Sequence, residues 1–128
     1  MARWISGVLA AVLGANGLAM LFAGFWWYGA VSGVAETGPY NPHFVRDIGA
    51  AYLVAAAGLG WFAWRPRQGW PALAAGAAFL TLHGAIHVYD AACGAEPVRM
   101  MARDFAGVFL PAALAVLIAI THGAEARA

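Results

Sequence analysis

The sequence is poor in charged residues and in cysteine, and it contains no lysine at all. Only 10% of its 128 residues are charged, whereas about 25% is usual for a soluble domain. The formal net charge of +1 provides no basic surface, so nucleic acid is not an expected partner. Cys93 is the only cysteine, which excludes an intramolecular disulfide and a CxxCH haem attachment. Nucleophile-elbow, phosphate-loop, HExxH and CxxC motifs are absent as well, and we expect no soluble catalytic domain.

Apolar sequence, in contrast, is abundant, because 63% of the residues are hydrophobic. A helix needs about 20 predominantly apolar residues to cross a bilayer, and four long apolar runs cover residues 4–28, 43–64, 70–89 and 105–120. The first run is too long for the apolar core of a cleaved signal peptide, which has about 7–15 residues. The runs predict an all-α integral membrane protein with one domain over residues 1–128, packed as an up-down-up-down four-helix bundle. The expected spans lie near residues 4–29, 42–64, 70–91 and 97–121.

Proline and asparagine mark the expected helix ends. The segment "VSGVAETGPYNP" joins the first two spans and ends on Asn41 and Pro42, which are typical of an N-cap and a first helical position. The segment "RPRQGWP" (65–71) is a tight connection, so the second and third spans should be antiparallel neighbours. Pro97 is expected to begin the fourth span, and Pro111 is expected to kink it.

The arginine positions indicate an orientation in the membrane. Positively charged residues in short connections favour the cytoplasmic side. Four arginines fall on the side of the 65–71 connection, namely Arg3, Arg65, Arg67 and Arg127. Three fall on the opposite side, namely Arg46, Arg99 and Arg103. We therefore expect both termini to be cytoplasmic.

Small residues recur along one face of the first span, at Gly7, Ala10, Gly14, Gly17 and Gly24. Such a stripe lets a second helix approach closely in lipid. The expected partners are therefore the lipid bilayer and, through this face, other helices of the bundle, another membrane protein or a second copy of the chain.

Two segments resemble each other and raise the hypothesis of two repeated hairpins. "VRDIGAAYLVAAAG" opens the second span and "ARDFAGVFLPAALA" opens the fourth. Both place an Arg-Asp pair at the outer start of a helix that runs inward, as related hairpins would do.

The ionisable residues of the spans gather on the non-cytoplasmic side. The second span carries His43 and Asp47 one turn apart, and the third carries a stripe of three polar residues along one face. Because charges in a membrane are costly unless they face the bundle interior, pair or bind a ligand, these residues predict a pocket lined by His43, Asp47, His83, His87 and Asp90. The residues expected to pair charges beside it are Arg46, Arg103 and Asp104.

Three interpretations of this pocket are open. The first is a structural network in which the arginines neutralise the carboxylates. The second is a metal or haem site, because two histidines one turn apart can hold one ion and His43 or Asp47 could add a ligand. The third is a site for protons or for a small polar ligand. The cofactor, if there is one, is not identified by these residues, and whether a reaction is catalysed is also open.

The segments "NPHFVRDIGAAYL" and "LHGAIHVYD" give the chain a resemblance to small bacterial four-span membrane proteins of the DoxX-like type. The resemblance rests on size, number of spans and polar groups at helix ends. It implies a location in a bacterial inner membrane and an accessory or redox-linked role. The expected function is a small accessory or ligand-binding membrane protein, and the alternatives are a metal- or haem-dependent membrane oxidoreductase and a component of proton or small-molecule transport.

Overall fold

The computed structural model describes the backbone of residues 1–127 and the side chains of residues 1–123. The described chain is helical and contains no strand, so the predicted all-α fold is confirmed. The elements in chain order are α1 (Ala2–Phe22), α2 (Gly24–Ala30), the 3₁₀ helix η1 (Val34–Thr37), α3 (Pro42–Trp64), α4 (Pro66–Cys93), α5 (Pro97–Asp104), the π-helical segment η2 (Phe105–Phe109) and α6 (Leu110–Arg127).

Four helices are long and apolar enough to cross a membrane. They are Ala2–Phe22, Pro42–Trp64, Pro66–Cys93 and Pro97–Gly123, the last of which runs through α5, η2 and α6. Together with the low content of charge, they make the chain an integral membrane protein.

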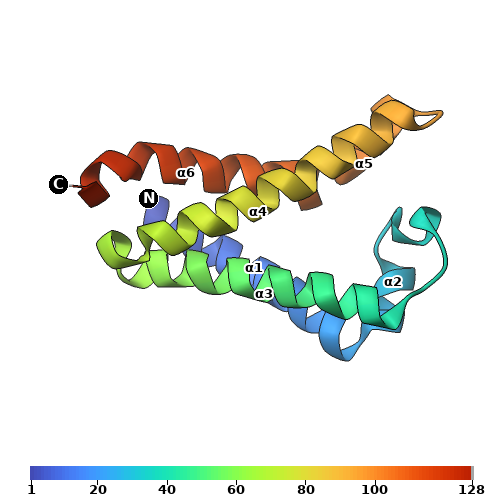
Figure 1. The fold of residues 1–128 in the computed structure, drawn as a ribbon, viewed down its shortest axis with the longest axis horizontal. Coiled ribbons are helices and arrows are strands. Elements are labelled where there is room, and N and C mark those ends of the chain that lie inside the picture. The colour runs from blue at the N-terminus through green and yellow to red at the C-terminus, as the bar shows by residue number, and fades with distance from the viewer. Residues whose placement is uncertain (128) are drawn as a thin grey trace.

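The four long helices form a bundle in which each one runs antiparallel to the one before it in the chain. Helix α1 packs along α3, α3 along α4, and α4 along α6, whereas α1 and α6 make few contacts with each other. The start of α1 and the end of α6 lie at the same end of the bundle, and at the opposite end α2 and η1 diverge from α5 (Figure 1). We call that opposite end the open end. Arg127 is expected on the side of the 65–71 connection, but its side chain lies outside the described part of the chain.

The small-residue face of α1 packs against α3 of the same chain. A Cβ added to Gly17 would lie 2.7 Å from the carbonyl oxygen of Gly49, and one added to Gly14 would lie 3.7 Å from the Cβ of Ala56. At Gly17 the two backbones are so close that no side chain fits between them. The stripe predicted to receive another helix therefore receives α3.

The connection between the second and third spans is shorter than predicted. Arg65 alone separates α3 from α4, so α4 begins at Pro66 and not near residue 70. Pro66 occupies the first helical position, where its missing N–H costs no hydrogen bond. Gly69 then lies directly on the backbone of Phe62, where a Cβ would collide. These two residues allow the helices to turn back within one residue.

Two irregularities shape the open end. The first span does not continue to residue 29, because the helix breaks at Ala23, whose φ of −132° is not helical, before α2 begins. The kink expected at Pro111 takes the form of the π-helical segment η2, which lies just before the proline. Pro111 has no N–H to donate and its ring would crowd the carbonyl of Gly107 in a regular α-helix, so the wider turn relieves that clash.

The start of α3 follows the prediction. The side chain of Asn41 accepts hydrogen bonds from the backbone N–H groups of His43 at 3.1 Å and Phe44 at 3.2 Å. Pro42 occupies the first helical position. This cap fixes the residue at which α3 begins.

Candidate functional site

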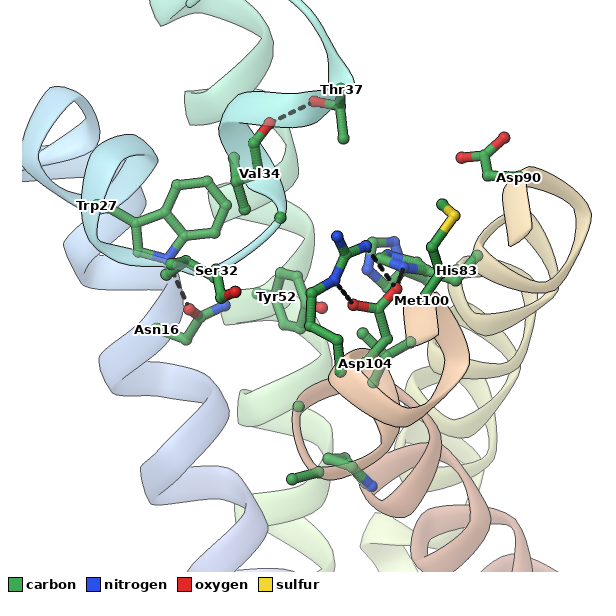
Figure 2. A pocket seen from close by; sticks show the side chains of 18 of the residues that line it. Asn16, Trp27, Ser32, Val34, Thr37, Tyr52, His83, Asp90, Met100 and Asp104 are labelled. Atoms are coloured by element: carbon green, nitrogen blue, oxygen red, sulfur yellow. Dashed lines mark hydrogen bonds and ion pairs between the residues drawn. The ribbon is translucent and has the colours of Figure 1, made fainter. Parts of the chain in front are cut away.

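A cavity of about 580 Å³ lies at the open end of the bundle, between α1 and the start of the fourth span. Figure 2 shows the Tyr52 ring between Asn16 and Trp27 on one side and Asp104 and His83 on the other. The lining residues that carry polar side-chain groups are Asn16, Trp27, Ser32, Glu36, Thr37, Tyr52, His83, His87, Asp90, Arg103 and Asp104.

The remaining wall of the cavity is apolar. Helix α1 contributes Val12 and Leu13, and the fourth span contributes Val108 and Pro111. A cavity with one polar and one apolar wall suits a ligand that has both kinds of surface.

Asp104 is the centre of the polar wall. It is only 8% exposed and is the one buried charged residue in the described part of the chain. The neighbouring Arg103 donates from Nε to Oδ1 at 2.7 Å and from Nη2 to Oδ2 at 3.2 Å, which is a forked arrangement. His87 Nδ1 lies 2.7 Å from the same Oδ2. Both carboxylate oxygens are therefore occupied, and the charge of Asp104 is balanced by that of Arg103.

The bond to Asp104 orients His87. An ionised carboxylate only accepts hydrogen bonds, so Nδ1 of His87 carries the proton of this contact. In the neutral imidazole, Nε2 is then a hydrogen-bond acceptor. His87 lines the cavity and its Nε2 has no hydrogen bond to another described residue, so this acceptor is available to a ligand.

Tyr52 and His83 form the inner part of the polar wall. Their ring centroids are 5.5 Å apart, and His83 is also 4.8 Å from the ring of His87. Tyr52 is only 5% exposed, yet its hydroxyl makes no hydrogen bond within the described residues. No fully enclosed side-chain nitrogen or oxygen of the described residues lacks a partner, so this hydroxyl is reachable from the cavity that Tyr52 lines.

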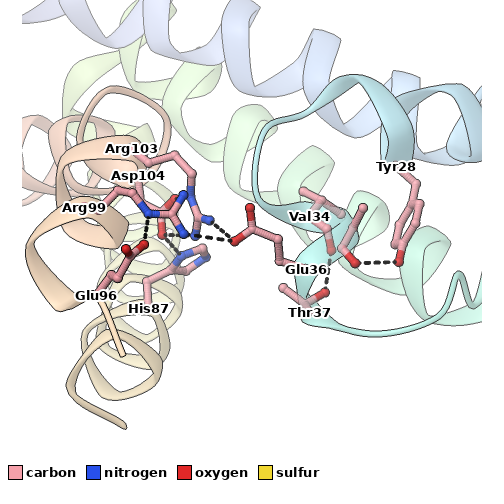
Figure 3. Close-up of polar contacts among 10 residues, drawn as sticks. Tyr28, Val34, Glu36, Thr37, His87, Glu96, Arg99, Arg103 and Asp104 are labelled. Carbon is pink, nitrogen blue, oxygen red and sulfur yellow. Dashed lines mark hydrogen bonds and ion pairs between the residues drawn. The ribbon is translucent and has the colours of Figure 1, made fainter. Parts of the chain in front are cut away.

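An ion pair spans the outer mouth of the cavity. Arg103 Nη1 donates to Glu36 Oε2 of η1 at 2.9 Å, and Arg99 Nη2 lies 4.0 Å from the same oxygen (Figure 3). The guanidinium of Arg103 also lies against Gly33, whose φ of +86° is in the left-handed region and which has no room for a Cβ. The 31–38 connection is thus held to α5 across the opening.

Helix α2 is tied to α1 on the other side of the cavity. Trp27 Nε1 donates to Asn16 Oδ1 at 2.8 Å. This bond satisfies a polar group in the first span and holds the Trp27 ring at the cavity wall (Figure 2).

The structure brings together only part of the pocket predicted from the sequence. His83, His87 and Asp90 line one cavity, with the exposed Asp90 at its rim. His43 and Asp47 do not line it: they are 87% and 61% exposed, and they contact each other at 3.4 Å. They lie outside the cavity because α3 turns a different face toward the bundle.

The face of α3 that is buried carries Val45, Gly49 and Tyr52, which are spaced by four and three residues as one face requires. His43, Arg46 and Asp47 lie off that face. The predicted pairing of Arg46 is likewise not found, because Arg46 is exposed and forms no ion pair among the described residues. Charge pairing occurs as predicted at Arg103 and Asp104.

Sequence reasoning missed Tyr52 and Glu36. Tyr52 is the one residue with a hydroxyl in the second span, and a buried tyrosine usually needs a partner for that group. That is the signal that could have identified it. Glu36 lies in the connection between the first two spans, and no local sequence pattern predicts that it pairs with the distant Arg103.

The described residues contain no group of three or more histidine, cysteine, aspartate or glutamate side chains that could hold a metal ion. His83 and His87 supply two imidazoles from one helix. Cys93 is exposed near the end of α4 and does not line the cavity.

Comparisons of the chain with protein-family models, with curated proteins and with solved structures find no match. The function is therefore argued from the geometry of the cavity.

Proposed function

We propose that the protein is a small ligand-binding or accessory protein of the membrane, and that the cavity at the open end holds its ligand. The proposal rests on the environment of Tyr52. Tyr52 is only 5% exposed. Its hydroxyl has no hydrogen-bond partner among the described residues and is reachable from the cavity of about 580 Å³.

The energetics favour an occupant for this site. Because the Tyr52 hydroxyl is reachable from the cavity, a ligand that hydrogen-bonds to it replaces water there, which is worth about 0.5–1.5 kcal/mol net. Such a ligand also gains contact with the apolar wall.

The Arg103–Asp104–His87 network has a positioning role in this proposal. The fork between Arg103 and Asp104 fixes the carboxylate, and the carboxylate fixes the ring of His87. A fixed ring presents its free nitrogen in one direction, which lowers the entropic cost of ligand binding. With the orientation predicted from the arginines, the cavity lies on the non-cytoplasmic side. The resemblance to small bacterial four-span proteins implies that the membrane is a bacterial inner membrane.

The alternative functions have less support. A metal-dependent oxidoreductase needs a set of ligands, and the described residues contain no group of three or more histidine, cysteine, aspartate or glutamate side chains that could hold a metal ion. A proton-transport component needs polar groups through the whole membrane, whereas below His83 the neighbouring residues of α4 are Phe79 and Leu80.

Native mass spectrometry tests the proposal. Wild-type protein extracted from its own membranes in mild detergent should carry a bound small molecule of defined mass. The matched variants are Gly107→Leu, at a cavity-lining position where a Cβ meets no atom within 4 Å, and Gly29→Leu, at an equally open position outside the cavity.

The proposal predicts that Gly107→Leu loses the bound molecule while Gly29→Leu retains it. Absence of any bound molecule from all three proteins, in extracts that retain annular lipid, would contradict ligand binding. An absorption band of haem or a stoichiometric metal in the same preparation would favour the oxidoreductase instead.

A further inference from the structure

We infer that the ligand is an electrically neutral amphiphile with a hydroxyl on its head, and that it reaches the cavity from the bilayer, between α1 and α6. This inference rests on the proposed function, because it names the class of molecule that the cavity would bind.

The side of the cavity between α1 and α6 is apolar. These two helices make few contacts with each other. Val12 is the central residue of α1 (Ala2–Phe22), lines the cavity and is 58% exposed. On the facing side, the lining residues Ala106 and Gly107 are also exposed. The middle of a membrane-spanning helix lies at hydrocarbon depth, so this side of the cavity faces lipid tails.

The side of the cavity toward water is lined by polar and charged groups, and one ion pair crosses it. Arg103 bridges α5 to Glu36 of η1 at 2.9 Å and lies against Gly33 (Figure 3). A ligand arriving from water would pass these polar and charged groups, whereas a ligand dissolved in the bilayer would meet the apolar side of the cavity first. The lateral route is therefore the favoured one.

The inner polar groups suit a neutral head. Asp104 and Arg103 neutralise each other, and both oxygens of Asp104 are already occupied. A cationic head would find no free carboxylate at that depth, since the unpaired carboxylate of Asp90 is exposed at the rim. An anionic head would meet the carboxylates of Glu36 and Asp90 at the rim without a free cation to receive it.

A hydroxyl on the head matches the free hydrogen-bonding groups. In the neutral imidazole of His87, Nε2 is an acceptor when Nδ1 donates to Asp104. The Tyr52 hydroxyl both donates and accepts. A hydroxyl can donate to the imidazole or accept from the tyrosine, while a chain attached to the head extends along Val12 and Val108 toward lipid.

The test uses the full chain, freed of its own bound molecule, in phosphatidylcholine nanodiscs. The probe is tritiated 4-dodecylphenol, and the competitors are dodecylbenzene, which lacks the hydroxyl, dodecyltrimethylammonium and dodecyl sulfate. We expect saturable binding of the phenol. We expect all three competitors to be weaker by about tenfold, the equivalent of one net hydrogen bond.

Two matched pairs of variants locate the binding. Tyr52→Phe should weaken binding of the phenol by about threefold to tenfold, because it removes a hydroxyl that has no partner in the protein, and Tyr89→Phe should not. Val12→Trp should slow association of the phenol, whereas Val8→Trp, one turn away on α1 and outside the cavity, should not.

Equal binding of dodecylbenzene, or tighter binding of either charged competitor, overturns the inference about the head. Association that Val12→Trp leaves unchanged overturns the lateral route. If the phenol does not bind although native mass spectrometry shows a molecule that Gly107→Leu displaces, the ligand class is wrong and the proposed function stands. If that molecule is also missing, both fail.

Discussion

Replacing Asp104 by asparagine should destabilise the protein by about 3 kcal/mol, the lower end of the range for breaking a buried ion pair. Asparagine has nearly the same shape but no charge, so the change leaves the guanidinium of Arg103 with a neutral neighbour. The loss is at the lower end because Arg103 is 16% exposed and keeps its contact with Glu36 at 2.9 Å. His87 also loses the carboxylate that accepts from its Nδ1.

The free energy of unfolding in mixed detergent and dodecyl sulfate micelles, followed by circular dichroism, measures this loss. The matched control is Asp47→Asn, which removes the charge from the exposed contact with His43 and should cost less than about 1 kcal/mol. The combination of Asp104→Asn with Arg103→Gln should cost less than the sum of the two single changes, since both act on one contact. Equal losses for Asp104→Asn and Asp47→Asn would refute the buried network.

Three further predictions concern packing, charge and orientation. Gly17→Val should lower thermal stability strongly, because its Cβ would lie 2.7 Å from the carbonyl oxygen of Gly49, whereas Gly29→Val meets no atom; equal melting temperatures would contradict the α1–α3 packing. Arg46→Ala should change the free energy of unfolding by less than about 0.5 kcal/mol, because surface substitutions usually do, and a larger loss would show a partner for Arg46. A membrane-impermeant thiol reagent should label the exposed Cys93 in intact cells, and labelling only after the membrane is opened would reverse the predicted orientation.

The fold could be predicted largely because lipid allows few solutions. A chain with four long apolar runs has to form helices, and Asn41 with Pro42 marked the start of α3 at the correct residue. The errors arose where local signals compete. Pro66 and Pro71 both suggested helix breaks, but Pro66 occupies the first helical position, where proline is tolerated, and Pro71 lies inside α4, so the helix begins earlier than predicted.

The candidate site was predicted only in part, because spacing along one helix does not fix which face turns inward. His83 and His87 were placed together correctly as residues one turn apart. His43 and Asp47 have the same spacing, yet the packing of Gly49 against α1 turns another face of α3 inward and leaves them outside.

The two Arg-Asp pairs show the same limit. Arg46 and Asp47 open α3 on its exposed face, whereas Arg103 and Asp104 precede a π-helical segment and turn toward the cavity. The repeat in sequence therefore does not give two equivalent sites. The difference depends on Pro111 and on tertiary contacts across the bundle, which a local pattern does not contain.

A crystal structure from a lipidic mesophase, grown from protein that retains its own bound molecule, tests the central claim most directly. Ligand binding in the cavity predicts continuous density for an organic molecule within hydrogen-bonding distance of the Tyr52 hydroxyl and of His87 Nε2, with its apolar part along Val12. Density for ordered water alone at the Tyr52 hydroxyl, or a cavity filled by the chain's own side chains, would contradict it.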